Sequence, residues 1–137
     1  MPESREPGEE RVVVTAIVTS DAGVLLCRRH DGEPEWSFPG GRWEAGETAR
    51  ECAARETAEE TGLAIEVGDQ LGRRVHPKTG RVIVYFAARA EGDDRRVRVG
   101  DPDEHAEGAW VSWAEARERL SHLFGPVAEH LERTLGA

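Results

Sequence analysis

The stretch that decides the fold runs from Gly41 to Leu63 and reads Gly-Arg-Trp-Glu-Ala-Gly-Glu-Thr-Ala-Arg-Glu-Cys-Ala-Ala-Arg-Glu-Thr-Ala-Glu-Glu-Thr-Gly-Leu. Thr48 followed by Glu51 is the pattern of a capping box, in which two side chains satisfy backbone N–H groups at the start of a helix. Gly62 supplies the matching stop signal. Residues 49–61 contain no proline or glycine and are rich in alanine, glutamate and arginine, which are acceptable or good helix formers. The sequence therefore predicts a helix over residues 49–61.

Apolar runs on both sides of this helix predict a strand-rich domain. Strands are expected at residues 11–19, 24–29, 36–38, 63–67, 81–90 and 109–112, where β-branched and other apolar residues cluster between turn-forming residues. Helical spacing of apolar residues predicts two further helices, at residues 113–120 and 126–135. Because neither a repeat nor a linker interrupts the pattern, residues 11–137 are expected to form a single domain, preceded by a solvated, charged tail at residues 1–10.

The composition is that of a globular protein and restricts the classes of partner. The 137 residues are 38% hydrophobic and 33% charged, and no apolar run approaches the length of a membrane-spanning helix, so no membrane partner is expected. A formal net charge of −9 argues against broad binding to nucleic acid, which needs a basic surface. Cys27 and Cys52 are too few for a disulfide framework and fall in apolar segments, which predicts structural thiols and a cytoplasmic location.

Three glutamates of the predicted helix are the strongest candidates for chemistry. A helix advances about 100° per residue, so Glu56, Glu59 and Glu60 are expected to share one narrow stripe of its surface. Neighbouring carboxylates repel one another, and this arrangement suits hard divalent cations that bridge protein oxygens and substrate phosphates. For an isolated acidic pair, a solvated helix face would be the preferred interpretation.

The same stretch resembles the Nudix box. That pattern is a glycine, five residues, a glutamate, seven residues, and then Arg-Glu, an apolar residue, any residue, Glu-Glu, any residue, a glycine and an apolar residue. Every charged and glycine position is matched, and Thr57 is the one departure, because an aliphatic residue is usual there. The resemblance implies an α/β/α sandwich around a central mixed β-sheet. It also implies hydrolysis of a pyrophosphate bond with Mg²⁺, or with Mn²⁺, and so outweighs the solvated-face interpretation.

The resemblance assigns residues in and near the box to three groups. The implied metal ligands are the Gly40 carbonyl, Glu56, Glu59 and Glu60. The implied structural positions are Gly41, Glu47 and Gly62. The implied catalytic residues are Glu56, Glu59, Arg55 and Glu104.

Two of these assignments carry alternatives. Arg55 is expected to hold Glu47 and so to orient the catalytic turn, although an ion pair within the helix is the commoner fate of a helical arginine. The residue that accepts a proton from the attacking water stays open between Glu56, Glu104 and Glu107, because family members differ in where their base lies. A solvated loop would explain Glu104 and Glu107 equally well.

Outside the box, the candidate substrate contacts are Arg28, Trp36 and Phe124. The rings of Trp36, Trp43 and Phe124 could stack on a nucleotide base, but aromatic residues more often pack in the core or at its rim. His76–Arg81 resembles a stretch of some relatives that act on nucleoside triphosphates, and a β-hairpin turn explains it almost as well.

The leading functional hypothesis is hydrolysis of a nucleoside triphosphate, ordinary or damaged, to a monophosphate and pyrophosphate. ADP-ribose, a dinucleoside polyphosphate or a nucleotide sugar is the alternative substrate, and a nucleotide-sensing module without turnover is the alternative class of protein. The intact glutamates of the box argue against the sensing module. The expected partner is therefore a small nucleotide and not a nucleic acid, and a homodimer is one open option for assembly.

Overall fold

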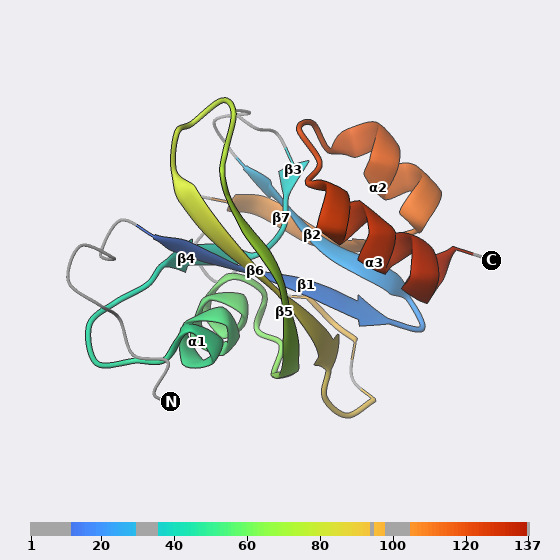
Figure 1. The fold of residues 1–137 in the computed structure, drawn as a ribbon. Coiled ribbons are helices and arrows are strands. Elements are labelled where there is room, and N and C mark those ends of the chain that lie inside the picture. The colour runs from blue at the N-terminus through green and yellow to red at the C-terminus, as the bar shows by residue number, and fades with distance from the viewer. Residues whose placement is uncertain (1–11, 30–35, 94, 98–104, 137) are drawn as a thin grey trace.

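The computed structural model describes residues 12–29, 36–93, 95–97 and 105–136. The elements, in chain order, are β1 (Val13–Ser20), β2 (Gly23–Arg29), β3 (Trp36–Ser37), β4 (Gly40–Arg42), α1 (Ala49–Thr61), β5 (Ile65–Val75), β6 (Val82–Ala90), β7 (His105–Val111), α2 (Trp113–Arg119) and α3 (Gly125–Leu135) (Figure 1). None of the helices in the described ranges is long and apolar enough to cross a membrane.

The seven strands form one mixed sheet with β1 at its centre. On one side β1 runs parallel to β6, with Val13 opposite Ile83. On the other side β1 pairs antiparallel with β4 near its start and with β2 at the turn that joins them. Strand β4 therefore lies beside the start of β1, where it contacts α1. This pairing brings the glycines that precede the helix close to the helix itself.

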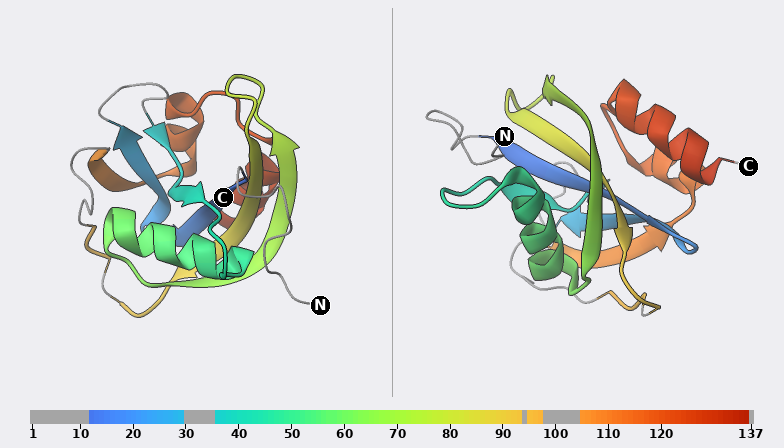
Figure 2. Two further views of the ribbon diagram at one scale, coloured as in Figure 1. Left: turned by 90° about the vertical axis from the view of Figure 1, so that its left-hand side faces the viewer. Right: turned by 60° about the horizontal axis from the view of Figure 1, so that its bottom comes forward.

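The strands present alternate residues to two hydrophobic layers, one on each face of the sheet. In β1, Val14 and Ala16 face the first layer and Ile17 faces the second, as the period of a strand requires. The helix residues buried in these layers are Ala49, Cys52 and Ala53 from α1, and Trp113, Ala116, Val127 and Leu131 from α2 and α3. Figure 2 shows α1 and α3 on opposite sides of the sheet. The predicted α/β/α sandwich is confirmed.

Helix α1 has the ends that its sequence predicts. The Thr48 hydroxyl accepts from the Glu51 N–H at 3.0 Å, and the Glu51 carboxylate accepts from the Thr48 N–H at 2.8 Å. Gly62 has φ of 76°, a left-handed conformation that suits glycine, and its N–H donates to the Ala58 carbonyl. The capping box and the glycine stop therefore fix both ends of the helix that carries the box glutamates.

Thr57, the one departure from the box pattern, is compatible with the core. Its side chain is fully buried, and its hydroxyl donates to the Ala53 carbonyl one turn earlier at 2.8 Å. Thr61 makes the same kind of bond to the Thr57 carbonyl at 2.7 Å. Because each hydroxyl is satisfied within the helix, no unpaired polar group enters the core, and Thr57 packs as an aliphatic residue would.

The structure extends two of the predicted strands and adds one that was not predicted. Strand β5 continues to Val75, well past the predicted end at Val67, and β7 begins at His105 and not at Ala109. Strand β4 lies where only a glycine loop was expected. Register shifts after Val67 and at Gln70 break the alternation of inward and outward residues in β5. The sequence pattern therefore stops before the strand does.

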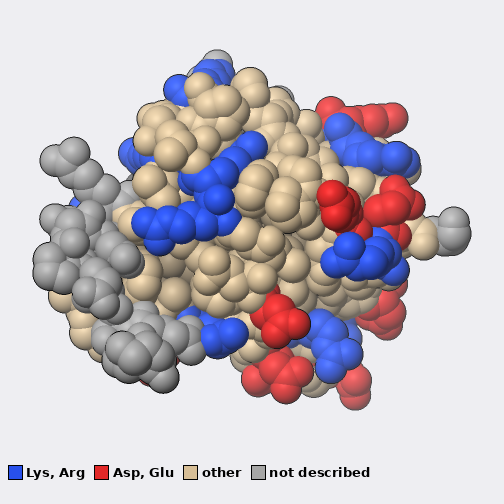
Figure 3. All heavy atoms as spheres, in the orientation of Figure 1, with Lys and Arg blue, Asp and Glu red and all other residues tan. Residues whose placement is uncertain are grey.

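Charge is unevenly distributed over the surface despite the net charge of −9. Residues 70–90, which span most of β5 and β6, contain Arg73, Arg74, Lys78, Arg81 and Arg89 and no aspartate or glutamate. On the face seen in Figure 3, the acidic side chains gather toward the right and lower edges, and only basic ones lie toward the upper left, where the β5–β6 hairpin lies in Figure 1. An anionic ligand therefore meets regions of both signs.

Candidate active site on helix α1

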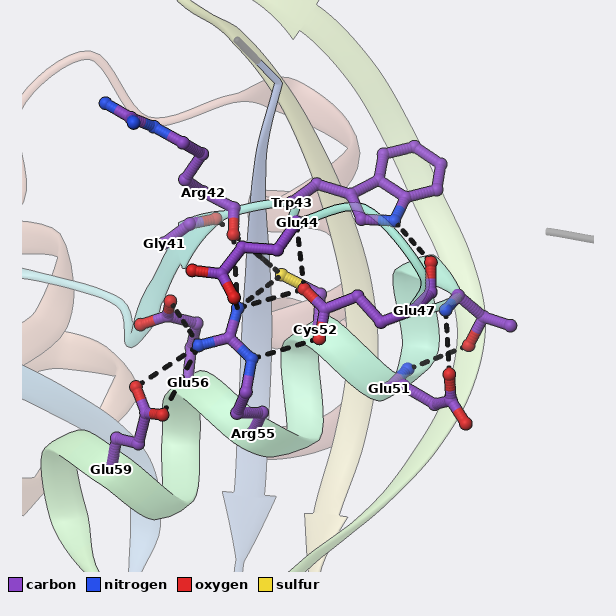
Figure 4. A network of polar contacts seen from close by, with 11 residues as sticks. Gly41, Arg42, Trp43, Glu44, Glu47, Glu51, Cys52, Arg55, Glu56 and Glu59 are labelled. Atoms are coloured by element: carbon purple, nitrogen blue, oxygen red, sulfur yellow. Dashed lines mark hydrogen bonds and ion pairs between the residues drawn. The ribbon is translucent and has the colours of Figure 1, made fainter. Parts of the chain in front are cut away.

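Arg55 is the hub of the polar network on α1 (Figure 4). Its Nε donates to Glu47 Oε2 at 3.0 Å and its Nη2 to Glu47 Oε1 at 2.9 Å, which is a two-pronged ion pair. Nη2 also donates to the Arg42 carbonyl at 3.2 Å. Nη1 points the other way and contacts Glu56 at 3.0 Å and Glu59 at 3.2 Å. One guanidinium thus joins the loop before the helix to two of the box glutamates.

The network shifts the pKa values of Glu47 and Arg55. The hydrogen bonds from Arg55 hold the pKa of Glu47 below its ordinary value, against the opposing effect of partial burial. The same bonds to Glu47 raise the pKa of Arg55 above its ordinary value. The predicted contact between Arg55 and Glu47 is confirmed, and the pair is ionised throughout the neutral range.

The three box glutamates have different surroundings. Glu60 is buried, the Glu56 side chain is 14% exposed, and the Glu59 side chain is 59% exposed. Around the surface of α1, the three side chains form an arc that runs from the core to the solvent. The prediction that they share one narrow stripe was therefore wrong. The reason is geometric, because adjacent residues on a helix point about 100° apart. Glu59 and Glu60 therefore cannot face the same way.

Two glycines let the backbone of β4 approach these carboxylates. A Cβ added to Gly41 would lie 2.3 Å from Glu56 Cδ, and a Cβ added to Gly40 would lie 2.5 Å from the Val14 carbonyl oxygen. Any side chain at either position would collide with the helix or with β1. The Gly40 N–H donates to Glu60 Oε1 at 3.3 Å. The paired glycines of the sequence therefore mark a close approach between β4 and α1.

Both cysteines lie beneath this network. The Cys27 thiol on β2 contacts Glu60 Oε1 at 4.0 Å, and the Cys52 thiol donates to the Arg42 carbonyl at 3.4 Å. Burial raises the pKa of each thiol above its ordinary value, and the nearby carboxylate of Glu60 or Glu47 raises it further. The thiols are therefore protonated and unreactive at neutral pH, as expected for structural cysteines.

The predicted substrate contacts lie away from this face. Trp36 and Phe124 belong to the second hydrophobic layer, on the side of the sheet opposite α1. The Arg119 guanidinium lies 4.5 Å from the centre of the Trp36 ring, and Phe124 packs 5.2 Å from the ring of Tyr85. Packing therefore explains both rings. Arg28 is exposed on β2, next to Trp36 in the sheet.

Several other sequence-based candidates can be placed. Trp43 is buried in the first layer, where its indole N–H donates to the Glu47 carbonyl at 2.9 Å and so supports the loop. His76 opens the turn between β5 and β6, and its Nδ1 accepts from two backbone N–H groups of that turn, which agrees with the hairpin interpretation. Glu104 and the Glu107 side chain lie outside the described residues.

Sequence reasoning missed the backbone acceptors that hold the network together. The Arg42 carbonyl accepts from both Arg55 and Cys52, and the Glu47 carbonyl accepts from Trp43. A carbonyl group is present at every position, so no residue type signals its role. These contacts follow only from the fold of the loop between β4 and α1.

The oxygen donors of this face have the chemistry that hard divalent cations prefer. Among the described side chains, no three histidine, cysteine, aspartate or glutamate residues are already grouped as a cation site. Arg55 Nη1 stands between Glu56 and Glu59. Since Nε and Nη2 alone hold Glu47, a cation could replace the Nη1 contacts without releasing that pair. The donors therefore fit a divalent cation, subject to this exchange.

Comparisons with known proteins identify the family. The sequence model of the NUDIX domain matches residues 9–131. The chain is 30% identical over 122 residues to a MutT-like protein of Streptomyces ambofaciens, covering 89% of this chain and 77% of that protein. It is 35% identical over 118 residues to the CTP pyrophosphohydrolase of Escherichia coli K12, covering 84% and 83%. The crystal structure of a NUDIX hydrolase from Nitrosomonas europaea superposes with a TM-score of 0.70 at 27% identity, covering 96% of this chain and 76% of that chain. With its box, its fold and a family match over most of its length, the chain belongs to the NUDIX family of hydrolases.

Proposed function

We propose that this protein hydrolyses a nucleoside triphosphate to a nucleoside monophosphate and pyrophosphate, using a divalent cation held on the side of α1 that faces β4. The observation that carries the proposal is that Gly41 and Gly40 of β4 lie against Glu56 and Glu60, while Arg55 links Glu56 to Glu59. The similarity to the CTP pyrophosphohydrolase of Escherichia coli supports a triphosphate as the substrate.

The proposed cation ligands are Glu56, Glu59, Glu60 and the Gly40 carbonyl. Carboxylate and carbonyl oxygens are the usual ligands of Mg²⁺ and Mn²⁺, and Mg²⁺ is also commonly shared between carboxylates and substrate phosphates. A bound cation would lower the pKa of an attacking water and neutralise charge on the phosphates. The basic β5–β6 hairpin supports the approach of a polyanion to a protein whose net charge is −9.

Each residue of the network would have its own task. Glu56 would accept the proton of the attacking water, because its carboxylate lies against the Gly41 backbone and is largely shielded from solvent. Arg55 would keep Glu47 and the Arg42 carbonyl in place and so hold the loop that carries the glycines. Glu104 and Glu107 stay the alternative proton acceptors, and the pH profiles of Glu104→Gln and Glu107→Gln test them.

A screen that identifies products tests this function directly. The purified protein is incubated with the common and oxidised nucleoside triphosphates, ADP-ribose, a dinucleoside polyphosphate and a nucleotide sugar, each with Mg²⁺ or Mn²⁺. We expect monophosphate and pyrophosphate from a triphosphate, and no turnover after exhaustive chelation. Faster turnover of ADP-ribose or another diphosphate would replace the proposed substrate. Tight nucleotide binding without turnover under any of these conditions would instead favour the nucleotide-sensing module.

A further inference from the structure

The carboxylate of Glu60 contacts groups from two strands, β4 and β2. Its Oε1 accepts from the Gly40 N–H of β4 at 3.3 Å and lies 4.0 Å from the Cys27 thiol of β2. Glu60 is only 8% exposed, and Cys27 is 1% exposed. Both donors therefore act on the carboxylate in a site shielded from water, where hydrogen bonds gain strength.

We infer that Cys27 is a positioning residue for Glu60. Its S–H donates to Oε1 and, together with the Gly40 N–H, fixes the direction in which the carboxylate faces the cation. The inference rests on the proposed function, in which Glu60 is a cation ligand. Cys27 lies on β2, outside the box and 33 residues before Glu60 in the chain.

The chemistry of the thiol suits this role. A cysteine side chain is a thiol at neutral pH and hence a donor, and its nearest carboxylate oxygen is an acceptor only. Groups that hydrogen-bond a metal ligand orient it, and their removal typically lowers metal affinity about 10-fold to 100-fold. A thiol is a weak donor, and 4.0 Å is a long separation even for sulfur. We therefore expect an effect near the lower end of that range.

The competing explanation is that Cys27 only fills space in β2. Threonine and valine separate the two explanations, because they have nearly the same shape and differ by a hydroxyl in place of a methyl group. Both are β-branched and suit a strand. If Cys27 only fills space, Cys27→Thr and Cys27→Val should bind a cation equally well. If its S–H orients Glu60, only the threonine variant keeps a donor.

The test is the direct titration of Mn²⁺ into the purified full-length protein without nucleotide, followed by electron paramagnetic resonance of the free ion. We expect Cys27→Val to lose about 10-fold in Mn²⁺ affinity and Cys27→Thr to stay within about 3-fold of wild type. The control is Val18→Ala, a buried loss of volume in β1 that belongs to the first layer and not to the site. It should lower the melting temperature and leave the Mn²⁺ affinity unchanged.

Each outcome decides the inference. Equal Mn²⁺ affinity of wild type and both Cys27 variants would overturn the positioning role and leave the proposed function intact. An equal loss in the threonine and valine variants would assign the effect to packing and would also overturn it. If the wild-type protein hydrolyses its substrate but binds no Mn²⁺ in this titration, Glu60 does not bind a cation in the nucleotide-free enzyme. That result would overturn the positioning role of Cys27 and leave the hydrolytic function intact. If the wild-type protein neither hydrolyses a nucleotide nor binds Mn²⁺, the proposed function itself is wrong.

Discussion

Arg55 donates two parallel hydrogen bonds to the Glu47 carboxylate, of 3.0 Å from Nε and 2.9 Å from Nη2. Its third nitrogen, Nη1, contacts Glu56 and Glu59. The guanidinium is planar and presents its donors as a fixed fork, which a lysine ammonium cannot reproduce. The charge alone is therefore insufficient at this position. The geometry of arginine is what lets one side chain serve the loop and the site together.

The first prediction follows from that fork. Arg55→Lys keeps the positive charge but loses the paired hydrogen bonds, so we expect a loss of about 1–2 kcal/mol in the free energy of unfolding. The turnover rate should fall by more than this loss of stability explains, because the loop that carries the glycines loses its paired hydrogen bonds to residue 55. Urea unfolding and steady-state kinetics measure the two effects. The control is Arg133→Lys on α3, where both quantities should stay near wild type.

The second prediction concerns how the free energy of unfolding changes as the pH falls. Because Arg55 lowers the pKa of Glu47 below its ordinary value of 4.5, the ionised carboxylate stabilises the folded state. That contribution is fully present above the ordinary pKa and is lost as the pH falls through the lowered pKa. Wild type should therefore be more stable than Glu47→Gln near neutral pH, and the difference should shrink in acid below about pH 4.5.

Chemical denaturation of wild type and Glu47→Gln at several pH values measures this difference. The other carboxylates titrate in both proteins, so the subtraction isolates Glu47. A stability difference that stayed constant down to strongly acidic pH would show that the Arg55 pair does not depress the titration of Glu47.

The third prediction tests the close approach of β4 to α1. In Gly41→Ala the new methyl group would lie 2.3 to 2.4 Å from the three carboxylate atoms of Glu56, so that carboxylate must move. We expect kcat to fall at least about 10-fold, because a displacement of this size in a catalytic group is costly. The free energy of unfolding should fall by about 1–3 kcal/mol, as is typical of overpacking.

Gly125→Ala is the matched control for this substitution. A Cβ at Gly125 meets nothing within 4 Å, and the position lies at the start of α3 on the other side of the sheet. Its kinetics should match wild type, and its stability should be unchanged or slightly higher, because alanine favours a helix more than glycine does. Comparable activity in the two alanine variants would contradict the proposed place of Glu56.

The features that were predictable from the sequence depend on neighbours in the chain. Helix α1 was predicted with both of its ends, because Thr48, Glu51 and Gly62 signal them locally. The contact between Arg55 and Glu47 was predicted from the resemblance to the box, and the structure confirms it. Even Thr57, which departs from the pattern, satisfies its hydroxyl within its own helix.

The features that were not predictable depend on distant segments. Glu59 and Glu60 are adjacent and chemically identical, yet only Glu60 is covered by Gly40 and Cys27, which come from two other strands. The full length of β5 depends on its pairing with β6, which continues across shifts in register that erase the pattern of alternating residues. Trp36 and Trp43 look alike in the sequence, and the topology of the sheet places them in opposite layers.

The last prediction asks whether the box glutamates do chemistry or only form a charged surface. Glu56→Gln and Glu59→Gln keep the size of the side chain and nearly the same helix propensity while removing one negative charge. If these carboxylates hold a cation or accept a proton, turnover should fall by about 10²-fold to 10⁴-fold. Folding should survive, because the exposed pair of Glu59 with Arg55 contributes only about 0–1 kcal/mol, and the amide that replaces the Glu56 carboxylate can still accept a hydrogen bond from Arg55.

The control is Glu118→Gln, an exposed glutamate of α2 on the other side of the sheet. A surface role would make all three variants behave alike, since each substitution would relieve repulsion between like charges and leave turnover near that of wild type. A catalytic role separates them, with normal turnover in Glu118→Gln and a large loss in the other two at similar melting temperatures. Turnover and melting temperature measured on the same preparations distinguish these results, and equal turnover in all three variants would leave the box as a feature of the fold alone.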